Sequence, residues 1–372
     1  MTAELPPAPR PLAGPPVQPA RRPLIHPLLV ITIVLGVLIL GMGTAAWWVT
    51  IEVERPYKAW SGDDVFVNIP QGAGVAAITR RLSEAGLIEH PFIFRLSVWQ
   101  QGAERQLKAG EYRFDRPMAP RRLVAALVRG DVHLRPLTFP EGLVVSEMAA
   151  LYEQGGFGTA AAFELAAQNV SLIADLDPAA PDLEGYLFPD TYQLPRRVEA
   201  TDLVKSMVAR FREVAGPVLP EVASTLGWTT REWVTLASLV EKETRLDAER
   251  PLVAAVYANR VRIGMGLQCD PTVIYALRLA GQWQGNLTRE NLQIDSPYNT
   301  YRYRGLPPGP IASPGKASLL AAASPARVDF LYFVSRNDGS HVFSATLAEH
   351  NLNVRRFQIE YFRQRRLEQR GG

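Results

Sequence analysis

The stretch REWVTLASLVEKETRLDAER, residues 231–250, decides the fold of this chain. Apolar residues recur through positions 233–240 at the spacing of one helical face. The preceding residues 229–232, Thr-Thr-Arg-Glu, form a capping box that satisfies the first free N–H groups of a helix. The pattern predicts a helix that begins after Thr229 and ends near Asp247.

Two glutamates, Glu241 and Glu243, border this apolar face on opposite flanks, whereas Lys242 points away toward solvent. A carboxyl packed against apolar side chains loses hydration, so its pKa rises, as a general acid near neutral pH requires. Glycosidic cleavage is commonly run by such an acid. In the alternative, both glutamates are structural and pair with Arg245, Arg250 or Arg260. The helical spacing does not decide whether these glutamates are catalytic or structural, and it does not decide which of the two would be catalytic.

Composition limits the possible functions. With 372 residues, of which 47% are hydrophobic, the chain can form two or three globular domains. Its net charge is only +3 and its basic residues are dispersed, which argues against a nucleic-acid-binding protein. The single cysteine excludes an internal disulfide, and the histidines show no paired spacing. Phosphate-binding glycine motifs are missing as well, so we expect no metal and no cofactor.

The N-terminal region predicts a membrane anchor. Residues 1–27 are rich in proline and predict a disordered tail. Residues 28–51 carry no charge over a length that spans a hydrocarbon core of ~30 Å, and Trp47 and Trp48 suit an interfacial aromatic belt. Arginines precede this segment and carboxylates follow it. The positive-inside rule therefore places the tail in the cytoplasm and the rest of the chain outside the inner membrane.

Two segments beyond the span form a near-repeat. Residues 67–88 and 137–157 each begin as a short strand, turn at Pro-x-Gly and continue with apolar residues at helical spacing. Between them, residues 108–114 predict a strand and residues 119–131 a helix closed by Gly130. The pattern predicts βααβ modules in an α+β fold.

The C-terminal half predicts further elements. One helix is expected from a cap at Asp247 to Gly264, and another begins with Asp270 as its cap. Residues 337–339, Asn-Asp-Gly, predict a hairpin tip, and Ser344 is expected to cap a last helix.

The aromatic segment DLEGYLFPDTYQLP, residues 182–195, contains Glu184 and Asp190. It is compatible with a sugar-binding groove, but its composition favours a packed loop.

Residues 313–316, Ser-Pro-Gly-Lys, match the S-x-x-K motif of penicillin-binding serine enzymes. Pro314 and Gly315 interrupt the helix that this motif needs, and no S-D-N or K-T-G follows. We therefore expect Ser313 to cap a helix.

Six separated motifs together resemble one known family. In chain order they are LKAGEYRF, LEGYLFPDTY, ASLVEKET, ANRVRIGMGLQCDPTVIYAL, SPYNTYRYRGLPPGPIASPG, and LYFV followed by HVFS, within about residues 60–355. In this order they resemble the MltG-like (YceG-like) endolytic murein transglycosylases.

The resemblance implies a single-pass membrane enzyme acting on peptidoglycan glycan strands. Its implied parts are the transmembrane helix (28–51), a LysM-like βααβ subdomain (52–135), an α+β catalytic domain (136–360) in the periplasm and a basic tail (361–372). Such an enzyme cleaves between N-acetylmuramic acid and N-acetylglucosamine and leaves a 1,6-anhydro end. The family also suggests that it ends nascent strands near cell-wall synthases, the penicillin-binding proteins.

The resemblance singles out Glu243 as the catalytic acid and base, with Glu241 in support. Other candidate groove positions are Gln268, Asp270, Thr272, Tyr298, Asn299 and Tyr301, together with Glu184 and Asp190 from the aromatic segment. Cys269 stands where other members often have threonine. A muramidase-type hydrolase and an inactive glycan-binding scaffold are the alternatives, although an intact E-K-E-T argues against the scaffold.

Overall fold

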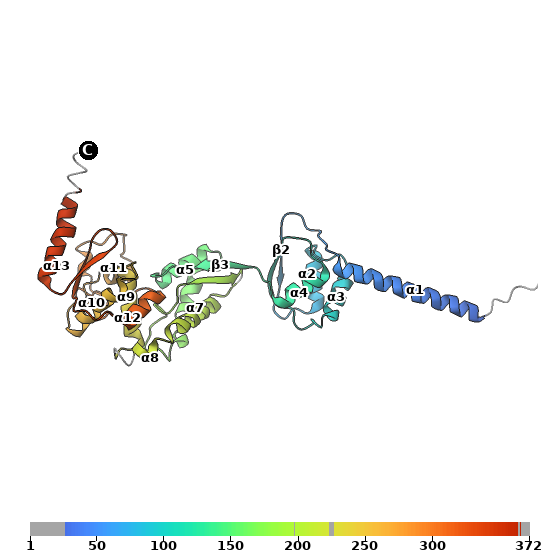
Figure 1. Ribbon diagram of the computed structural model, residues 1–372, viewed down its shortest axis with the longest axis horizontal. Helices are drawn as coiled ribbons and strands as arrows, with labels where there is room; N and C mark the ends of the chain where they lie inside the picture. The colour runs from blue at the N-terminus through green and yellow to red at the C-terminus, as the bar shows by residue number, and fades with distance from the viewer. Residues whose placement is uncertain (1–26, 197, 223–226, 364, 366–372) are drawn as a thin grey trace, which may run out of the picture. The chain divides into compact units, whose positions relative to one another are not determined.

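The computed structural model describes residues 27–196, 198–222, 227–363 and 365. The chain divides into two units between Asp131 and Val132, a few residues before the boundary expected at 135 (Figure 1). The expected disordered tail lies outside the described residues except for Pro27, as does most of the C-terminal basic tail.

Helix α1 (Pro27–Glu54) is the candidate membrane anchor. From Leu28 to Glu54 it is long and apolar enough to cross a membrane, slightly beyond the expected end at residue 51. Its large apolar side chains are exposed, including Leu40 at 69% and Trp47 at 68%. Exposed side chains of this kind need an apolar surrounding outside the chain itself.

The first unit contains a βααβ module, as expected. Strand β1 (Val65–Ile69) leads to α2 (Val75–Glu84) and α3 (Pro91–Gln100), and the chain returns as β2 (Gly110–Phe114). Strands β1 and β2 pair antiparallel from Val65 opposite Phe114 to Ile69 opposite Gly110. Helix α4 (Pro120–Arg129) follows and ends at Gly130, whose φ of 78° supplies the left-handed cap.

The second unit opens with the same order of elements, so the near-repeat extends over whole modules. Strand β3 (Leu134–Thr138) leads to α5 (Val145–Gln154) and α6 (Ala160–Ala167), then to η1 (Val170–Leu172) and β4 (Thr191–Pro195). Strands β3 and β4 pair antiparallel, and α7 (Ala200–Ala215) follows. The two turns are also alike, because Gly72 and Gly142 adopt φ values of 76° and 79°.

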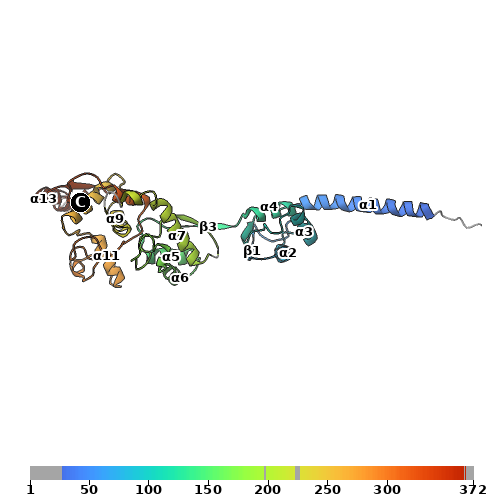
Figure 2. The same ribbon diagram turned by 90° about the horizontal axis from the view of Figure 1, so that it is seen from below.

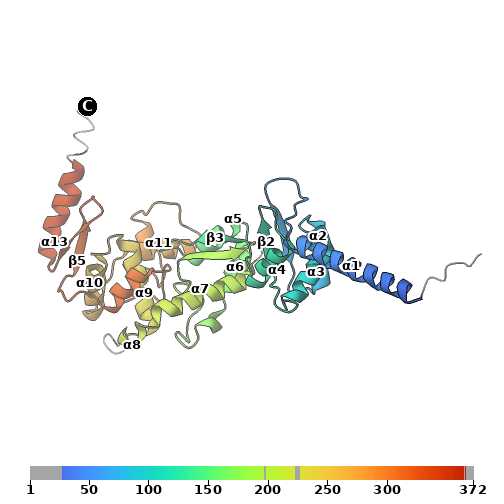
Figure 3. The same ribbon diagram turned by 45° about the vertical axis from the view of Figure 1, so that its right-hand side comes forward.

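The rest of the second unit is mainly helical (Figure 2). Its elements are α8 (Leu219–Glu221), α9 (Thr230–Glu243), α10 (Arg250–Arg262), α11 (Asp270–Leu279), η3 (Asn291–Gln293), α12 (Lys316–Ala323), β5 (Tyr332–Ser335), β6 (His341–Ser344), α13 (Leu347–Val354) and η4 (Arg355–Glu360). Strands β5 and β6 form the expected hairpin, with Asn337 and Gly339 at positive φ in its turn. Within this unit β3 and the β5–β6 hairpin lie at opposite ends (Figure 3).

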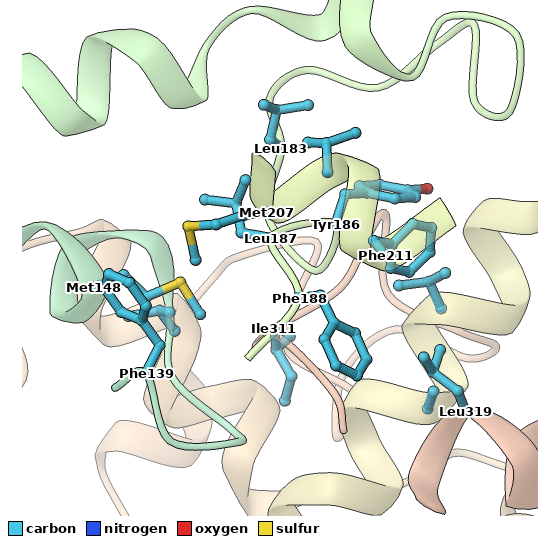
Figure 4. Packing of buried hydrophobic residues seen from close by; sticks show 14 of the residues in the cluster. Phe139, Met148, Leu183, Tyr186, Leu187, Phe188, Met207, Phe211, Ile311 and Leu319 are labelled. Carbon is cyan, nitrogen blue, oxygen red and sulfur yellow. The ribbon is translucent and has the colours of Figure 1, made fainter. Parts of the chain in front are cut away.

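Helix α9 is the centre of the second unit and packs against α10, α11 and α12. All eight residues 233–240 are buried, so α9 is enclosed on every side and does not show the single apolar face that its sequence predicts. Trp233 donates from Nε1 to the carbonyl of Leu319 at 3.0 Å. Side chains such as Met148, Met207 and Ile311 belong to the same hydrophobic cluster (Figure 4).

The expected end of α9 and the expected starts of α10, α11 and α13 are wrong, and local hydrogen bonds explain the first two. Helix α9 ends at Glu243 and not near Asp247, because Thr244 is extended and its Oγ1 accepts from the N–H of Leu246. Helix α10 therefore begins at Arg250, after Glu249.

The other boundaries move by one or two residues. Cys269, not Asp270, occupies the N-cap position of α11, so Asp270 is its first residue. Ser344 lies in β6, whereas Thr346 caps α13 by accepting from the N–H of Glu349.

A close approach of the chain to Gly185 predicts a stability difference between two glycines. Gly185 and Gly264 both have positive φ, at 82° and 67°. A Cβ at Gly185 would lie 2.4 Å from that of Pro310, whereas nothing lies within 4 Å of one at Gly264. We expect Gly264→Ala to lower the free energy of unfolding by about 1 kcal/mol and Gly185→Ala by about 3 kcal/mol. Denaturant titration of both variants measures this, and equal losses would contradict the packing.

Candidate active site

The carboxyl of Glu243 lies where three helices meet. Glu243 is the last residue of α9, and its Oε1 accepts a hydrogen bond from the hydroxyl of Tyr257 on α10 at 2.7 Å. The thiol of Cys269, at the N-cap of α11, donates to the same oxygen at 3.1 Å. Tyr257 and Cys269 are fully buried, while Glu243 is partly buried. The site is therefore built on rigid elements.

The surroundings of Glu243 favour its protonated form. Burial raises the pKa of Glu243 above its usual range, and the negative charge of Asp270 acts in the same direction. The hydrogen bonds from Tyr257 and Cys269 lower this pKa and offset part of the effect, as does the nearby His341. The result is a carboxyl that holds its proton to a higher pH than an exposed glutamate, which suits a general acid.

A second cluster fixes the chain just after Glu243. Thr244 donates from Oγ1 to Oε2 of Glu249 at 3.2 Å. The same oxygen lies 2.7 Å from Nδ1 of His341, and Oε1 of Glu249 accepts from the backbone N–H of His341 at 2.8 Å. Burial acts to raise the pKa of Glu249, but its bonds to His341 outweigh this and lower it. Through Glu249, the β5–β6 hairpin is therefore hydrogen-bonded to Thr244, the residue that follows the end of α9.

Glu241 has a different environment, although it is only two residues away. Its Oε2 accepts from the N–H of Gly315 at 3.0 Å and from the hydroxyl of Ser318 at 2.8 Å, at the start of α12. Its Oε1 lies 3.7 Å from Nη2 of Arg250, and both side chains are nearly buried. The arginine pairing considered for both glutamates thus holds for Glu241, and it holds through Arg250.

Lys242 is exposed, as expected, but it is also bonded. Its Nζ donates to the carbonyl of Gly142 in the turn after β3 at 3.0 Å. The end of α9 therefore contacts both the turn after β3 and the start of α12, all within the second unit.

Three of the candidate groove residues are exposed, and two of them, Asp270 and Tyr301, lie close enough to Glu243 to interact with its charge. Asp270 accepts from the hydroxyl of Tyr301 at 2.6 Å, and both side chains are exposed. Gln268 is exposed and has a φ of 51°, an unusual value for a residue other than glycine. Tyr298 is partly buried, with its ring 4.9 Å from that of Tyr275.

Thr272 and Asn299 are fully buried and cannot contact a ligand in this conformation. Thr272 donates to the carbonyl of Cys269 at 2.7 Å and shares a 2.9 Å bond with Thr300. Asn299 donates from Nδ2 to the carbonyls of Leu292 and Ile294 at 3.0 and 2.8 Å. Both residues hold the loops that present the exposed candidates.

Glu184 and Asp190, also in the second unit, contact residues other than Glu243. Both carboxylate oxygens of Glu184 accept from the N–H of Val145 at the start of α5, and burial raises the pKa of Glu184 to about 8. Glu184 lines a cavity of about 360 Å³ together with Asp182 and Arg278. Asp190 binds Arg210 at 2.9 Å. Asp190 thus forms a half-exposed ion pair, whereas Glu184 lies at a cavity wall.

Among the described residues, neither the Ser313–Lys316 motif nor the group of possible metal ligands forms a second catalytic site near Glu243. Ser313 is fully buried while Lys316 is exposed, and Gly315 occupies the N-cap position of α12 that Ser313 was expected to fill. Among the described residues, Glu52, Glu89 and His90 in the first unit group as possible metal ligands. Arg55 already binds Glu52 there at 3.0 Å.

Sequence reasoning missed Tyr257, Glu249 and His341. Tyr257 follows the apolar spacing of α10 and looks like an ordinary core residue. His341 shows no paired spacing, because its partner Glu249 lies 92 residues earlier. Only the fold brings these groups to Glu243.

Comparison with known proteins places this geometry in a family. Residues 67–356 match the YceG-like family. The chain belongs to this family. A Bacillus subtilis protein named endolytic murein transglycosylase is 33% identical over 322 residues, covering 80% of this chain and 86% of the relative. A protein of the same name from Streptococcus pneumoniae serotype 2 is 32% identical, and the match covers 80% of this chain but 59% of that longer protein.

A solved structure has a similar fold. It is a putative yceG-like protein from Listeria monocytogenes, 30% identical, with a TM-score of 0.53. The match covers 78% of this chain and 99% of the Listeria chain.

The buried contacts of Glu241 predict a stabilising role. Glu241→Gln removes the negative charge that faces the buried guanidinium of Arg250 and leaves Asp247 as its carboxylate partner. We expect the free energy of unfolding to fall by about 2 kcal/mol. Glu232→Gln, in the exposed capping box of the same helix, is the matched control and should cost less than about 0.5 kcal/mol because glutamine also suits that position. Equal stability of the two variants would refute the role of Glu241.

Proposed function

We propose that this chain is a membrane-anchored endolytic murein transglycosylase in which Glu243 is both the acid and the base. Membership of the YceG-like family and the names of the relatives support the reaction. The environment of Glu243 carries the residue assignment. It combines a partly buried carboxyl with a raised pKa and a position beside exposed groove candidates such as Asp270.

In the first step, protonated Glu243 gives its proton to the oxygen that joins N-acetylmuramic acid to N-acetylglucosamine. The bond between this oxygen and C1 of the muramic acid breaks, and the N-acetylglucosamine leaves with a free 4-hydroxyl. A carboxyl whose pKa is raised by burial is protonated at neutral pH more often than an exposed one, so it is ready for this step.

In the second step, the Glu243 carboxylate takes the proton from the 6-hydroxyl of the same muramic acid. The 6-oxygen bonds to C1 and closes the 1,6-anhydro ring, while Glu243 returns to its starting protonation state. One carboxyl therefore completes the cycle, and neither a second carboxylate nucleophile nor water is consumed. Glu241 takes no part in the proton transfers, in keeping with its bonds to α12.

The other parts of the chain have roles in the same proposal. Helix α1 anchors the enzyme in the inner membrane, with the N-terminus in the cytoplasm and both units in the periplasm. The βααβ module of the first unit acts as a LysM-like subdomain that holds glycan, and residues 136–360 form the catalytic domain. An enzyme held at the membrane meets glycan strands where they are made, so nascent strands are its substrate and penicillin-binding synthases are its neighbours.

The assignment of Glu243 predicts a folded but inactive variant. Glu243→Gln, prepared as the full chain in detergent, should lose at least about 100-fold of its rate on isolated glycan strands, because glutamine cannot transfer the proton. Its far-ultraviolet circular dichroism and its melting should stay close to those of the parent. Glu241→Gln is the control and keeps cleavage activity per folded molecule. If Glu243→Gln cleaves normally and Glu241→Gln does not, the roles are reversed.

The internal attack of the 6-hydroxyl predicts the mass of the products. Mass spectrometry of glycan digested by the full chain should show new ends that lack one water compared with hydrolysis. Ends that contain the water would instead identify a muramidase-type hydrolase. Binding of glycan strands without any cleavage would identify a scaffold.

A further inference from the structure

The two oxygens of the Glu243 carboxyl are not equivalent. Oε1 accepts from the Tyr257 hydroxyl at 2.7 Å and from the Cys269 thiol at 3.1 Å. Within the part of the chain that the structure describes, no hydrogen bond reaches Oε2. Both donors therefore hold the same edge of the carboxyl and leave the other edge open.

Both donors are fixed in place and keep their protons. Tyr257 is fully buried, with its ring edge-on to Phe333 at a centroid distance of 6.0 Å. The backbone of Cys269 is bonded on both sides, its N–H to Thr300 at 3.0 Å and its carbonyl to Thr272 at 2.7 Å. Burial raises the pKa values of the Tyr257 hydroxyl and the Cys269 thiol well above their usual ranges. They are hydrogen-bond donors throughout the neutral pH range.

We propose that Tyr257 and Cys269 are positioning residues that hold Oε1 of Glu243, so that only Oε2 faces the glycan and exchanges the proton. This inference rests on the proposed function of Glu243. A carboxyl free to rotate would present either oxygen in many orientations, whereas a carboxyl bonded along one edge presents one oxygen in one direction. Neither positioning residue needs to touch the glycan.

The same two bonds also set the strength of the acid. They favour the ionised form and so oppose the effect of burial on the pKa of Glu243. Other groups that act on Glu243 are Asp270 at the start of α11 and His341 on β6, and Tyr301 lies beside Asp270. Removing the Tyr257 hydroxyl leaves these groups unchanged and raises the pKa of Glu243, which weakens the acid and lowers the rate of proton transfer.

The test is the pH dependence of glycan cleavage by full-length Tyr257→Phe in detergent. We expect kcat to fall about tenfold, the factor that corresponds to one hydrogen bond to a charged group, with KM nearly unchanged. The alkaline limb of the kcat profile should move to higher pH, because Glu243 then keeps its proton longer. A merely structural role would lower the active fraction but would not move this limb.

Tyr186→Phe is a matched control, since Tyr186 is equally buried and donates to the Asp177 carboxylate at the same distance of 2.7 Å. It should leave the alkaline limb in place. If Tyr257→Phe does not fold, the kcat profiles of Cys269→Ala and Cys269→Ser provide a second, independent test. The alanine variant should move the limb in the same direction, and serine, which restores a donor, should return it toward the parent.

Two results would overturn the inference. The first is an unmoved limb in both Tyr257→Phe and Cys269→Ala. The second is an equal shift in Tyr186→Phe. Either result, with Glu243→Gln inactive, would leave the proposed function intact and refute only the role of the two donors. Normal activity of Glu243→Gln would instead refute the proposed function itself.

Discussion

The enclosure of helix α9 is the constraint on which the second unit depends. Residues 233–240 are buried on all sides, so the helix is placed by α10, α11 and α12 together and cannot shift without breaking several contacts. Because Glu243 is the last residue of this helix, its backbone is fixed in place as well. The burial that stabilises the helix also removes water from the carboxyl and raises its pKa. Packing and acid strength thus have one physical origin, and a change in the core around α9 acts on both.

The sharp end of α9 matters as much as its burial. Thr244 adopts an extended conformation and bonds to Leu246 and Glu249, and this stops the helix directly after Glu243. Because the helix stops, Glu243 sits at a helix end, with Tyr257 and Cys269 on one edge of its carboxyl. Among the described residues, none forms a hydrogen bond with the other oxygen, Oε2.

The sequence predicts most of the helices and strands, but it does not predict the contacts between elements that are far apart in the chain. The capping box at Thr229, the near-repeat and the hairpin turn are local signals, so the elements they predict are present. The end of α9 was misplaced because Thr244 carries no strong breaking signal and its hydrogen bonds depend on Glu249. Helical periodicity left Glu241 and Glu243 equivalent. Only tertiary contacts separate them, since Arg250 and Ser318 bind Glu241 while Tyr257 binds Glu243.

The two glutamates also show how one short motif can link structure to chemistry. Two helical positions differ by about 200°, so Glu241 and Glu243 point to nearly opposite sides of α9. Glu241 meets the start of α12, where the N–H of Gly315 and the hydroxyl of Ser318 donate to its Oε2. Lys242, between them, binds the turn of the βααβ module through Gly142. Glu241 and Lys242 thus hold the end of α9 through contacts that need no substrate, and this leaves the third residue, Glu243, as the one whose second oxygen can serve a reaction.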